Sequence, residues 1–264
     1  RDWFEATGYR VLYGDTDSVF VATGHDGPDG PPFAELEALG KRLAGELNQH
    51  IADTIHERWQ LESALAIRSE KVYGRFLITR MRKAGRASGD GDPDADRGRA
   101  KGYAGLLLAA NGSSSVEVKG MEAARSDWTA LARRFQTEVL AMVFADRSAA
   151  EIRDYLDRVA SDLRAGRLDD ELVYKKMLRR NASAYERGET PQVRAARLLG
   201  WTERRGSVEY LMTTAGAEPL GRVEHVIDYE HYVGHQLLPI WDSIADAAGL
   251  AEGGRFSRQA EFEW

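Results

Sequence analysis

Two short runs of strand-forming residues, Tyr9–Tyr13 and Val19–Val21, lie on either side of a stretch rich in Gly and Asp. β-Branched and aromatic residues favour strands, whereas Gly14 and the aspartates that follow it suit a tight turn. Two strands separated by so few residues predict an antiparallel β-hairpin. The start of the chain is therefore expected to form a hairpin with carboxylates at its tip.

Asp15 and Asp17 are the candidate metal ligands of this hairpin. Residues at positions i and i+2 of a strand face the same side, so the spacing predicts that the two carboxylates converge. Hard cations such as Mg²⁺ prefer carboxylate oxygens. A solvated Gly/Asp turn is the alternative for such a short segment. A calcium loop is excluded, because Phe20 and Asp26 stand where an EF-hand needs Gly and Glu.

Apolar residues recur at intervals of three and four from Phe33 to Trp59 and predict one long amphipathic helix. His50 and His56 lie off this stripe, so they are expected at the surface and not as metal ligands. Beyond the helix, residues 66–78 and 103–110 predict a pair of strands. Residues 84–100 between them are rich in Gly and Asp and predict a surface loop. The acidic residues of this loop also suggest a calcium site, but no regular element is expected to fix them.

Helical spacing returns from Ser126 to the end of the chain, with a single strand expected at residues 207–214. Either Ser126 or Asp127 is expected to cap the first helix, and the second is expected to end at Gly166. Pro191 fits the first turn of a third helix, and residues 229–248 predict a closing helix. The predicted fold class is α+β: an antiparallel sheet with packed helices, followed by a mainly α-helical part.

The chain has 264 residues, of which 43% are hydrophobic, and no cysteine. This composition predicts a globular protein with no disulfide and no thiolate metal site. The sequence has no apolar run long enough to cross a membrane and no signal-peptide pattern, so we expect a soluble protein of a reducing cytoplasm.

The formal net charge is −6, which is unusual for a protein that binds nucleic acid. Basic residues are clustered, however, and phosphate binding depends on the local potential more than on the total charge. Any one cluster taken alone is also typical of a solvated helix face. The clusters contain Arg75, Arg80, Arg82, Lys83 and Arg86; Arg97, Arg99 and Lys101; Lys175, Lys176, Arg179 and Arg180; and Arg194, Arg197, Arg204 and Arg205.

Several motifs resemble family B DNA polymerases, in sequence order. The segment Tyr13–Ser18 resembles the metal-binding hairpin of the polymerase palm, and Lys101–Gly105 is similar to the Lys-x-Tyr motif that holds the primer duplex. The segment Val118–Trp128 resembles the junction between palm and thumb. Further segments resemble the thumb, and the subgroup most similar is the bacterial DNA polymerase II type. These thumb-like segments are 172–180, Tyr185, 191–196, 228–232 and 236–239.

This resemblance implies a C-terminal palm segment at residues 1–125 and a thumb with a C-terminal tail at residues 126–264. It implies template-directed DNA synthesis by two-metal phosphoryl transfer in a longer polymerase. The fingers, the exonuclease and an upstream metal-binding Asp of such a polymerase have no counterpart in this sequence. Asp17 corresponds to the main metal ligand, and Asp15 adds charge beside it. The Mg²⁺ site would be completed by the missing Asp, so this chain is expected to be inactive alone.

The same resemblance implies primer–template DNA and dNTP as partners, with no membrane. Ala100 and Gly102 stand where the family usually has basic residues, which predicts a weaker grip. As an alternative, Lys101 and Tyr103 would be ordinary strand residues. The implied DNA-binding residues are Lys101, Tyr103, Lys175, Lys176, Arg179, Arg180 and Arg194.

The last residues resemble a peptide with which bacterial polymerases dock on a sliding clamp. Gln259, Phe262 and Trp264 follow the pattern after a hinge at Gly253 and Gly254, although two aromatic residues replace the usual Leu and Phe. A frayed terminus is the alternative. Such a polymerase is expected to be nucleoid-associated in a bacterial cytoplasm.

A stand-alone nucleic-acid-binding module that has lost catalysis is the alternative function. The genomic reading frame separates the two hypotheses, because an upstream exonuclease and fingers region would support the polymerase.

Overall fold

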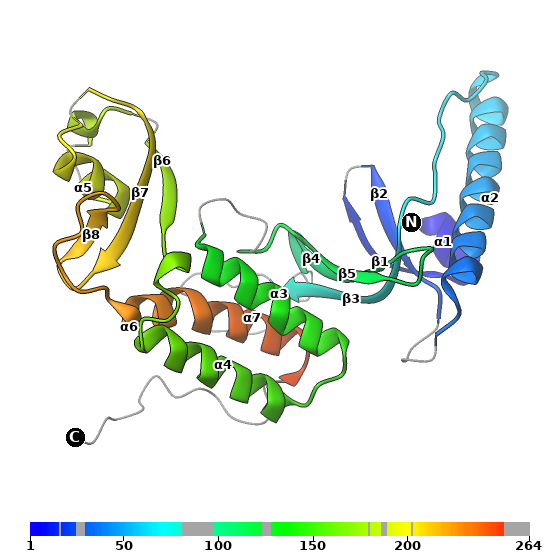
Figure 1. The fold of residues 1–264 in the computed structure, drawn as a ribbon. Helices are drawn as coiled ribbons and strands as arrows, with labels where there is room; N and C mark the ends of the chain where they lie inside the picture. The colour runs from blue at the N-terminus through cyan, green and yellow to red at the C-terminus, as the bar shows by residue number, and fades with distance from the viewer. Residues whose placement is uncertain are drawn as a thin grey trace, which may run out of the picture. The chain divides into compact units, whose positions relative to one another are not determined.

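The computed structural model describes residues 1–15, 17–24, 30–80, 98–122, 128–178, 180–185, 189–201 and 203–250, with the backbone alone at 15, 80 and 98–101. Helices and antiparallel strands are mixed along the chain (Figure 1), which confirms the α+β class. The chain divides into two compact units, Arg1–Phe76 with Gly105–Glu117, and Leu77–Ala104 with Val118–Trp264. Within the described part of the chain, no helix is both long enough and apolar enough to cross a bilayer.

The first unit begins with the short helix α1 (Asp2–Ala6) and the predicted hairpin, β1 (Arg10–Asp15) and β2 (Ser18–Ala22). The strands are antiparallel, and Val11 pairs with Val21 whereas Tyr13 pairs with Phe20. The register therefore shifts by one residue at Leu12, which is a β-bulge. The hairpin expected from the sequence is confirmed, and its bulge is a feature that the sequence pattern did not predict.

Helix α2 (Phe33–Trp59) has the bounds that its apolar stripe predicts. Leu43 and Leu47 of this stripe are buried against Phe4 of α1, and partly buried residues of the hairpin and of α2 surround them. His50 and His56 are exposed, as expected for residues off the stripe. The last residue of the stripe, Trp59, is not buried, because 59% of its surface is exposed. The helix thus packs on α1 and on the hairpin through its middle turns.

A three-stranded sheet has the order β3 (Val72–Arg80), β4 (Gly98–Leu108) and β5 (Ser114–Lys119). The strand predicted over residues 66–78 begins later, because the backbone of Ile67 bonds to the side chain of Asn48 at 2.7 and 2.8 Å instead of to a neighbouring strand. The strand predicted from residue 103 begins earlier, at Gly98. Residues 98–100 of the predicted loop are therefore strand, and residues 84–97 lie outside the described part.

The helices of the second unit include α3 (Ala130–Phe144) and α4 (Ala149–Arg164). The cap of α3 is Thr129, whose hydroxyl accepts a bond from the Ala132 amide at 3.2 Å. The prediction of Ser126 or Asp127 was wrong, because Thr129 is the polar side chain that reaches the free amides of the first turn. Helix α4 ends at the predicted place, with Gly166 just beyond its cap at φ +71°.

The second unit also contains a sheet of β6 (Tyr174–Leu178), β7 (Gly206–Thr213) and β8 (Gly216–Pro219), in that order. Helix α5 (Pro191–Leu198) packs beside this sheet (Figure 1), with Val193 and Ala196 buried against Val208. The sequence predicted Pro191 at the start of this helix and β7, but not β6 or β8. Two consecutive lysines on β6 hide the alternation that marks a strand.

The closing helix is interrupted. Helix α6 (Tyr229–Tyr232) leads into a π-helical turn, Val233–Leu237, and then into α7 (Leu238–Ala247). Single π-helical turns inside α-helices are frequent at functional sites. The predicted span is confirmed, but its π turn was not expected from the residue spacing.

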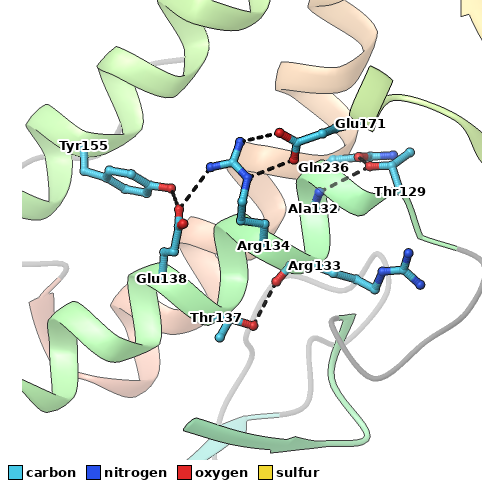
Figure 2. A network of polar contacts seen from close by, with 9 residues as sticks. All are labelled: Thr129, Ala132, Arg133, Arg134, Thr137, Glu138, Tyr155, Glu171 and Gln236. Atoms are coloured by element: carbon cyan, nitrogen blue, oxygen red, sulfur yellow. Dashed lines mark hydrogen bonds and ion pairs between the residues drawn. The ribbon is translucent and has the colours of Figure 1, made fainter. Parts of the chain in front are cut away.

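A network of polar contacts ties α3 to α4 and to the 3₁₀ turn Asp169–Glu171 (Figure 2). Arg134 of α3 makes a two-pronged ion pair with Glu171, with N–O distances of 2.8 and 3.0 Å. Its remaining nitrogen contacts Glu138 at 3.2 Å, and the hydroxyl of Tyr155 donates to that same carboxylate. Burial raises the pKa of Tyr155, and its hydrogen bond to Glu138 adds to the rise. Tyr155 therefore stays protonated as a donor across the physiological range.

Candidate functional site

The tip of the hairpin carries the two candidate metal ligands. Asp15, the last residue of β1, pairs with Ser18, the first residue of β2, so Asp17 lies in the connection between the strands. Asp17 is exposed in this connection. Because Asp17 lies outside the strands, the alternation of side chains between the two faces of a strand does not determine which way Asp17 points. The side chain of Asp15 lies outside the described part. The structure places Asp17 at the apex of a short hairpin, open to solvent.

The two faces of the hairpin are held in different ways. One face carries Val11 and Val21, which pack on the buried residues of α1 and α2. On the other face, the ring of Phe20 stacks on Phe76 of β3 with 4.8 Å between centroids, and Tyr13 lies 5.7 Å from Phe20. The bulge at Leu12 makes this possible, because it turns Tyr13 away from the face of Val11.

The ring of Tyr73 completes this aromatic cluster. It lies 6.0 Å from Phe20 and 5.6 Å from Phe76 between centroids, and its hydroxyl donates to Glu117 at 3.2 Å. Gly105 on β4 leaves the room that the ring needs, because a Cβ atom there would overlap Tyr73. The hairpin base is therefore fixed by packed rings, while its tip stays accessible.

The carboxylate of Asp17 suits a hard divalent cation, but one such group does not make a site. Across the residues that the structure describes, no three His, Cys, Asp or Glu side chains come together as metal ligands would. Mg²⁺ is usually held by one or two carboxylates together with substrate phosphates and water. The exposed carboxylate of Asp17 therefore fits one ligand position of a magnesium site.

Strand β4 carries the pair of residues implied as the primer grip. Tyr103 is half-buried, and Gly102 is buried, with its carbonyl oxygen 3.4 Å from the hydroxyl of Thr79. Lys101 belongs to the same strand, but its side chain lies outside the described part. Gly102 is thus buried within the sheet, and only its backbone groups could contact a ligand.

Three of the other implied DNA-binding cations lie on or after β6. Lys175 is exposed and pairs with Glu209 of β7 at 2.9 Å, opposite it in the strand register. Lys176 is half-buried on the other face of the strand, and Arg180 is exposed beyond its end. Arg179 lies outside the described part. The structure therefore places these three cations on or just after one strand, with Lys175 in an ion pair.

Arg194 of α5 lies against the neighbouring sheet. A Cβ atom on Gly216 would be 3.2 Å from its Nε, so the side chain passes closely over β8. Gly216 has φ +103°, a conformation that glycine adopts without strain. The Nε of Arg194 is buried without a hydrogen-bond partner among the described residues. Only part of this guanidinium is therefore available to a ligand.

Other polar residues near this sheet were not singled out individually from the sequence. The guanidinium of Arg204 lies 4.2 Å from the centre of the Trp201 ring, a cation–π contact. The side chain of Asn181 donates to Glu203 at 2.5 Å and accepts from Arg205 at 3.1 Å. The basic character of this stretch was visible in the sequence, but its contacts depend on loop geometry that residue spacing does not encode.

The sequence of this chain is similar to those of known proteins. The family model for DNA polymerase family B matches residues 98–217. DNA polymerase II of Escherichia coli is 37% identical over 252 residues, which cover 91% of this chain and 29% of that protein. DNA polymerase 2 of Aeropyrum pernix is 28% identical over 97% of this chain and 28% of its own length. The DNA polymerase delta catalytic subunit of Bos taurus is 27% identical over 88% of this chain and 20% of its own length.

The chain spans less than a third of the length of these relatives. At these coverages the matches include the strands β3 to β5 and the sheet β6–β7–β8, and the match with the Aeropyrum pernix protein also includes the Asp17 hairpin. The family model and the bacterial relative together show that this chain belongs to DNA polymerase family B.

Proposed function

We propose that this chain contributes the metal-binding hairpin and the DNA-gripping part of a template-directed DNA polymerase. The observation that carries the proposal is the exposed Asp17 at the apex of a hairpin whose base is packed on both faces. A carboxylate held on a rigid support is what a catalytic cation requires. In this proposal, residues 1–125 are the end of the palm and residues 126–264 are the thumb.

The cation in this proposal is Mg²⁺. When bound, two such ions stabilise the charge that develops on the attacking and leaving oxygens of phosphoryl transfer. Asp17 would hold the ion from the hairpin, with Asp15 beside it in the sequence. Substrate phosphates and a carboxylate from another segment would supply the remaining ligands. The residues of this chain thus orient the reacting groups, and the incoming dNTP brings the phosphate that is transferred.

The primer–template grip in this proposal belongs to β4 and to the sheet β6–β7–β8. Exposed cations bind backbone phosphates without reading the base sequence. The candidates on and just after β6 are Lys175, Lys176 and Arg180, and the ion pair with Glu209 must open before Lys175 reaches a phosphate. An exposed pair of this kind contributes only about 0.2–1 kcal/mol, so it opens readily. Binding duplex DNA would associate the protein with the nucleoid.

A chimera tests the proposal directly. This chain would replace the matching segment of the Escherichia coli DNA polymerase II relative, and primer extension would be measured for the chimera and for its Asp17→Asn variant. The expected result is extension by the chimera and a loss of at least about a hundredfold in the variant, because a metal-ligand carboxylate is removed. Thermal melting of both proteins establishes that they are folded.

A folded chimera that extends primers equally well with Asn at position 17 would overturn the assignment of the hairpin. A folded chimera that binds duplex DNA but does not extend primers would instead support a nucleic-acid-binding module without catalysis.

A further inference from the structure

Five aromatic rings form a continuous joint between the sheet β6–β7–β8 and the closing helices of the second unit. The ring of Tyr174 on β6 stacks on Tyr210 of β7 at 5.2 Å and on Tyr232 of α6 at 5.6 Å between centroids. The members of this aromatic joint are Tyr174, Tyr210, His231, Tyr232 and His235.

Hydrogen bonds fix the same contact. The hydroxyl of Tyr174 lies 3.1 Å from Nε2 of His231, and the amide of Met212 donates to the hydroxyl oxygen of Tyr232 at 2.8 Å. Tyr232 is fully buried. The sheet is therefore attached to α6 through buried rings and two specific polar contacts.

Two histidines lie together at this joint, where the closing helix changes to its π-helical turn. The rings of His231 and His235 are 4.6 Å apart between centroids, and His231 is half-buried. Two imidazolium ions at this separation repel each other. A neutral imidazole has one nitrogen that accepts a hydrogen bond, whereas an imidazolium has none.

The surroundings of His231 offer little compensation for a positive charge. Asp228 caps α6 and accepts a bond from the backbone amide of His231 at 3.0 Å. Glu230 is engaged by Arg164 of α4 at 2.5 and 3.0 Å, and Asp169 lies 3.4 Å from the hydroxyl of Tyr229. The rings that lie against the imidazole are Tyr174 of β6, Tyr232 of α6 and His235 of the π turn.

We propose that the His231–His235 pair makes the attachment of the β6–β7–β8 sheet sensitive to protons. Above the ordinary titration range of histidine, neutral His231 accepts the hydroxyl of Tyr174 and the joint is closed. As the pH falls, protonation turns Nε2 from an acceptor into a donor, so the Tyr174 hydroxyl can no longer donate to it, and two positive rings then lie side by side. The joint then loosens, and the sheet with its cations becomes more mobile relative to the helices.

The direction of the pH effect on stability follows from the direction in which the pKa of His231 is shifted. Burial lowers the pKa of His231, and the charge of His235 lowers it further, while Asp228 opposes them. The unfolded chain therefore binds a proton more readily than the folded one. The stabilising contribution is fully present above about pH 6.5, the ordinary histidine value, and is lost as the pH falls through the range below it.

The experiment uses the whole chain with protons as the only ligand. Histidine-selective NMR gives the titration of His231 between pH 4.5 and 8, and amide hydrogen exchange over residues 174–178 and 206–213 reports the joint. Exchange rates are corrected for the intrinsic effect of pH. The expected result is a His231 midpoint below the ordinary value and a loss of protection at these strands as the pH falls through that midpoint.

Two variants distinguish the effect of the His231–His235 pair from a nonspecific effect of low pH on the whole protein. His235→Gln keeps a polar side chain but removes the second charge, so the His231 midpoint should rise and the loss of protection should become smaller. His56→Gln, on the exposed side of α2, is the matched control and should change neither. A His231 midpoint at or above the ordinary value in the unmodified chain would overturn the proposal without any variant. So would an unchanged loss of protection in folded His235→Gln.

Discussion

Tyr13 pairs with Phe20 across the hairpin, one residue out of step with the pair formed by Val11 and Val21. The extra residue is Leu12, and its bulge sends the side chains on either side of it to opposite faces. On one face Val11 and Val21 pack on the buried residues of α1 and α2, and on the other face Phe20 packs on the rings of Tyr73 and Phe76. The bulge therefore lets a short hairpin be held from both sides while its acidic tip stays exposed.

The first prediction concerns the ring that links the hairpin to β3. Phe20→Ala removes the stack with Phe76 and should destabilise the first unit by about 1–3 kcal/mol, less than a fully buried Phe because the ring is half-buried. Amide exchange at Gly14 and Val19 should accelerate, as measured by NMR. Val19→Ala is the matched control on the other face, where 41% of the side chain is exposed, and should cost well under half as much.

The second prediction concerns the glycine beneath the same cluster. Gly105→Ala adds a methyl group where the ring of Tyr73 lies, so the ring must move away from Phe20 and Phe76. Overpacking of this kind typically costs about 1–3 kcal/mol. Denaturant unfolding should show the loss, and the NMR signals of Phe20 should shift. Gly45→Ala is the control, because a methyl group there meets no atom within 4 Å and sits inside α2.

If Gly105→Ala were as stable as Gly45→Ala and left the signals of Phe20 in place, the ring of Tyr73 would not be the support that we describe.

The elements that the sequence predicted are those set by a long local pattern. Helix α2 has the predicted bounds because its apolar stripe runs over many turns, and the hairpin follows from two strand-forming runs on either side of a short Gly/Asp stretch. Features that depend on a distant partner were missed. The strand β3 starts late because Asn48, far away in the chain, captures the backbone of Ile67.

The same reasoning applies to the candidate site. The position of Asp17 at a hairpin tip followed from residues close to it in the sequence, whereas the rings that hold the hairpin come from β3 and were not predicted. The ion pair of Lys175 with Glu209 joins two strands, of which only β7 was expected. Cross-strand partners follow from the sheet register, and a cluster of basic residues does not encode that register.

The third prediction concerns the polar network of α3. Arg134→Met keeps the length of the side chain but leaves Glu138 and Glu171 without their shared cation, so it should destabilise the second unit by about 1 kcal/mol. The estimate is modest because the Arg134 side chain keeps 36% of its surface exposed. Thermal unfolding measures the change. Arg147→Met removes an exposed pair with Glu151 and should change stability by less than about 0.5 kcal/mol.

The fourth prediction concerns the DNA grip. Duplex binding by this chain should weaken as salt rises, with log K falling against log salt by about 0.9 for each phosphate contacted. Replacing Lys176 and Arg180 with Ala should reduce this slope, whereas Lys41→Ala on α2, which is not among the implied DNA-binding residues, should not. Fluorescence anisotropy with a labelled primer–template measures both. A flat response to salt would contradict a phosphate-gripping surface.

The C-terminal tail gives a separate prediction, which concerns a segment outside the described residues. A peptide of residues 255–264 should bind a bacterial sliding clamp saturably, with a Kd below about 100 μM, or about −5.5 kcal/mol. Replacing Phe262 and Trp264 with Ala should abolish binding, because aromatic anchors dominate such interfaces. Calorimetric titration decides, and no binding in that range would favour a frayed terminus.

The last prediction is that this chain does not extend a primer by itself. Asp17 offers one exposed carboxylate, and the described residues gather no three metal-ligating side chains, so a cation bound here would keep most of its water. Each unfilled ligand position lowers the affinity for Mg²⁺ and leaves the reacting oxygens unoriented. Because the proposed site needs a carboxylate from another segment, highly purified chain should show no extension above background at millimolar Mg²⁺, measured with a labelled primer–template and all four dNTPs. Extension that disappears in the Asp17→Ala variant would mean that this chain alone completes a metal site. The proposed need for a second carboxylate would then be wrong.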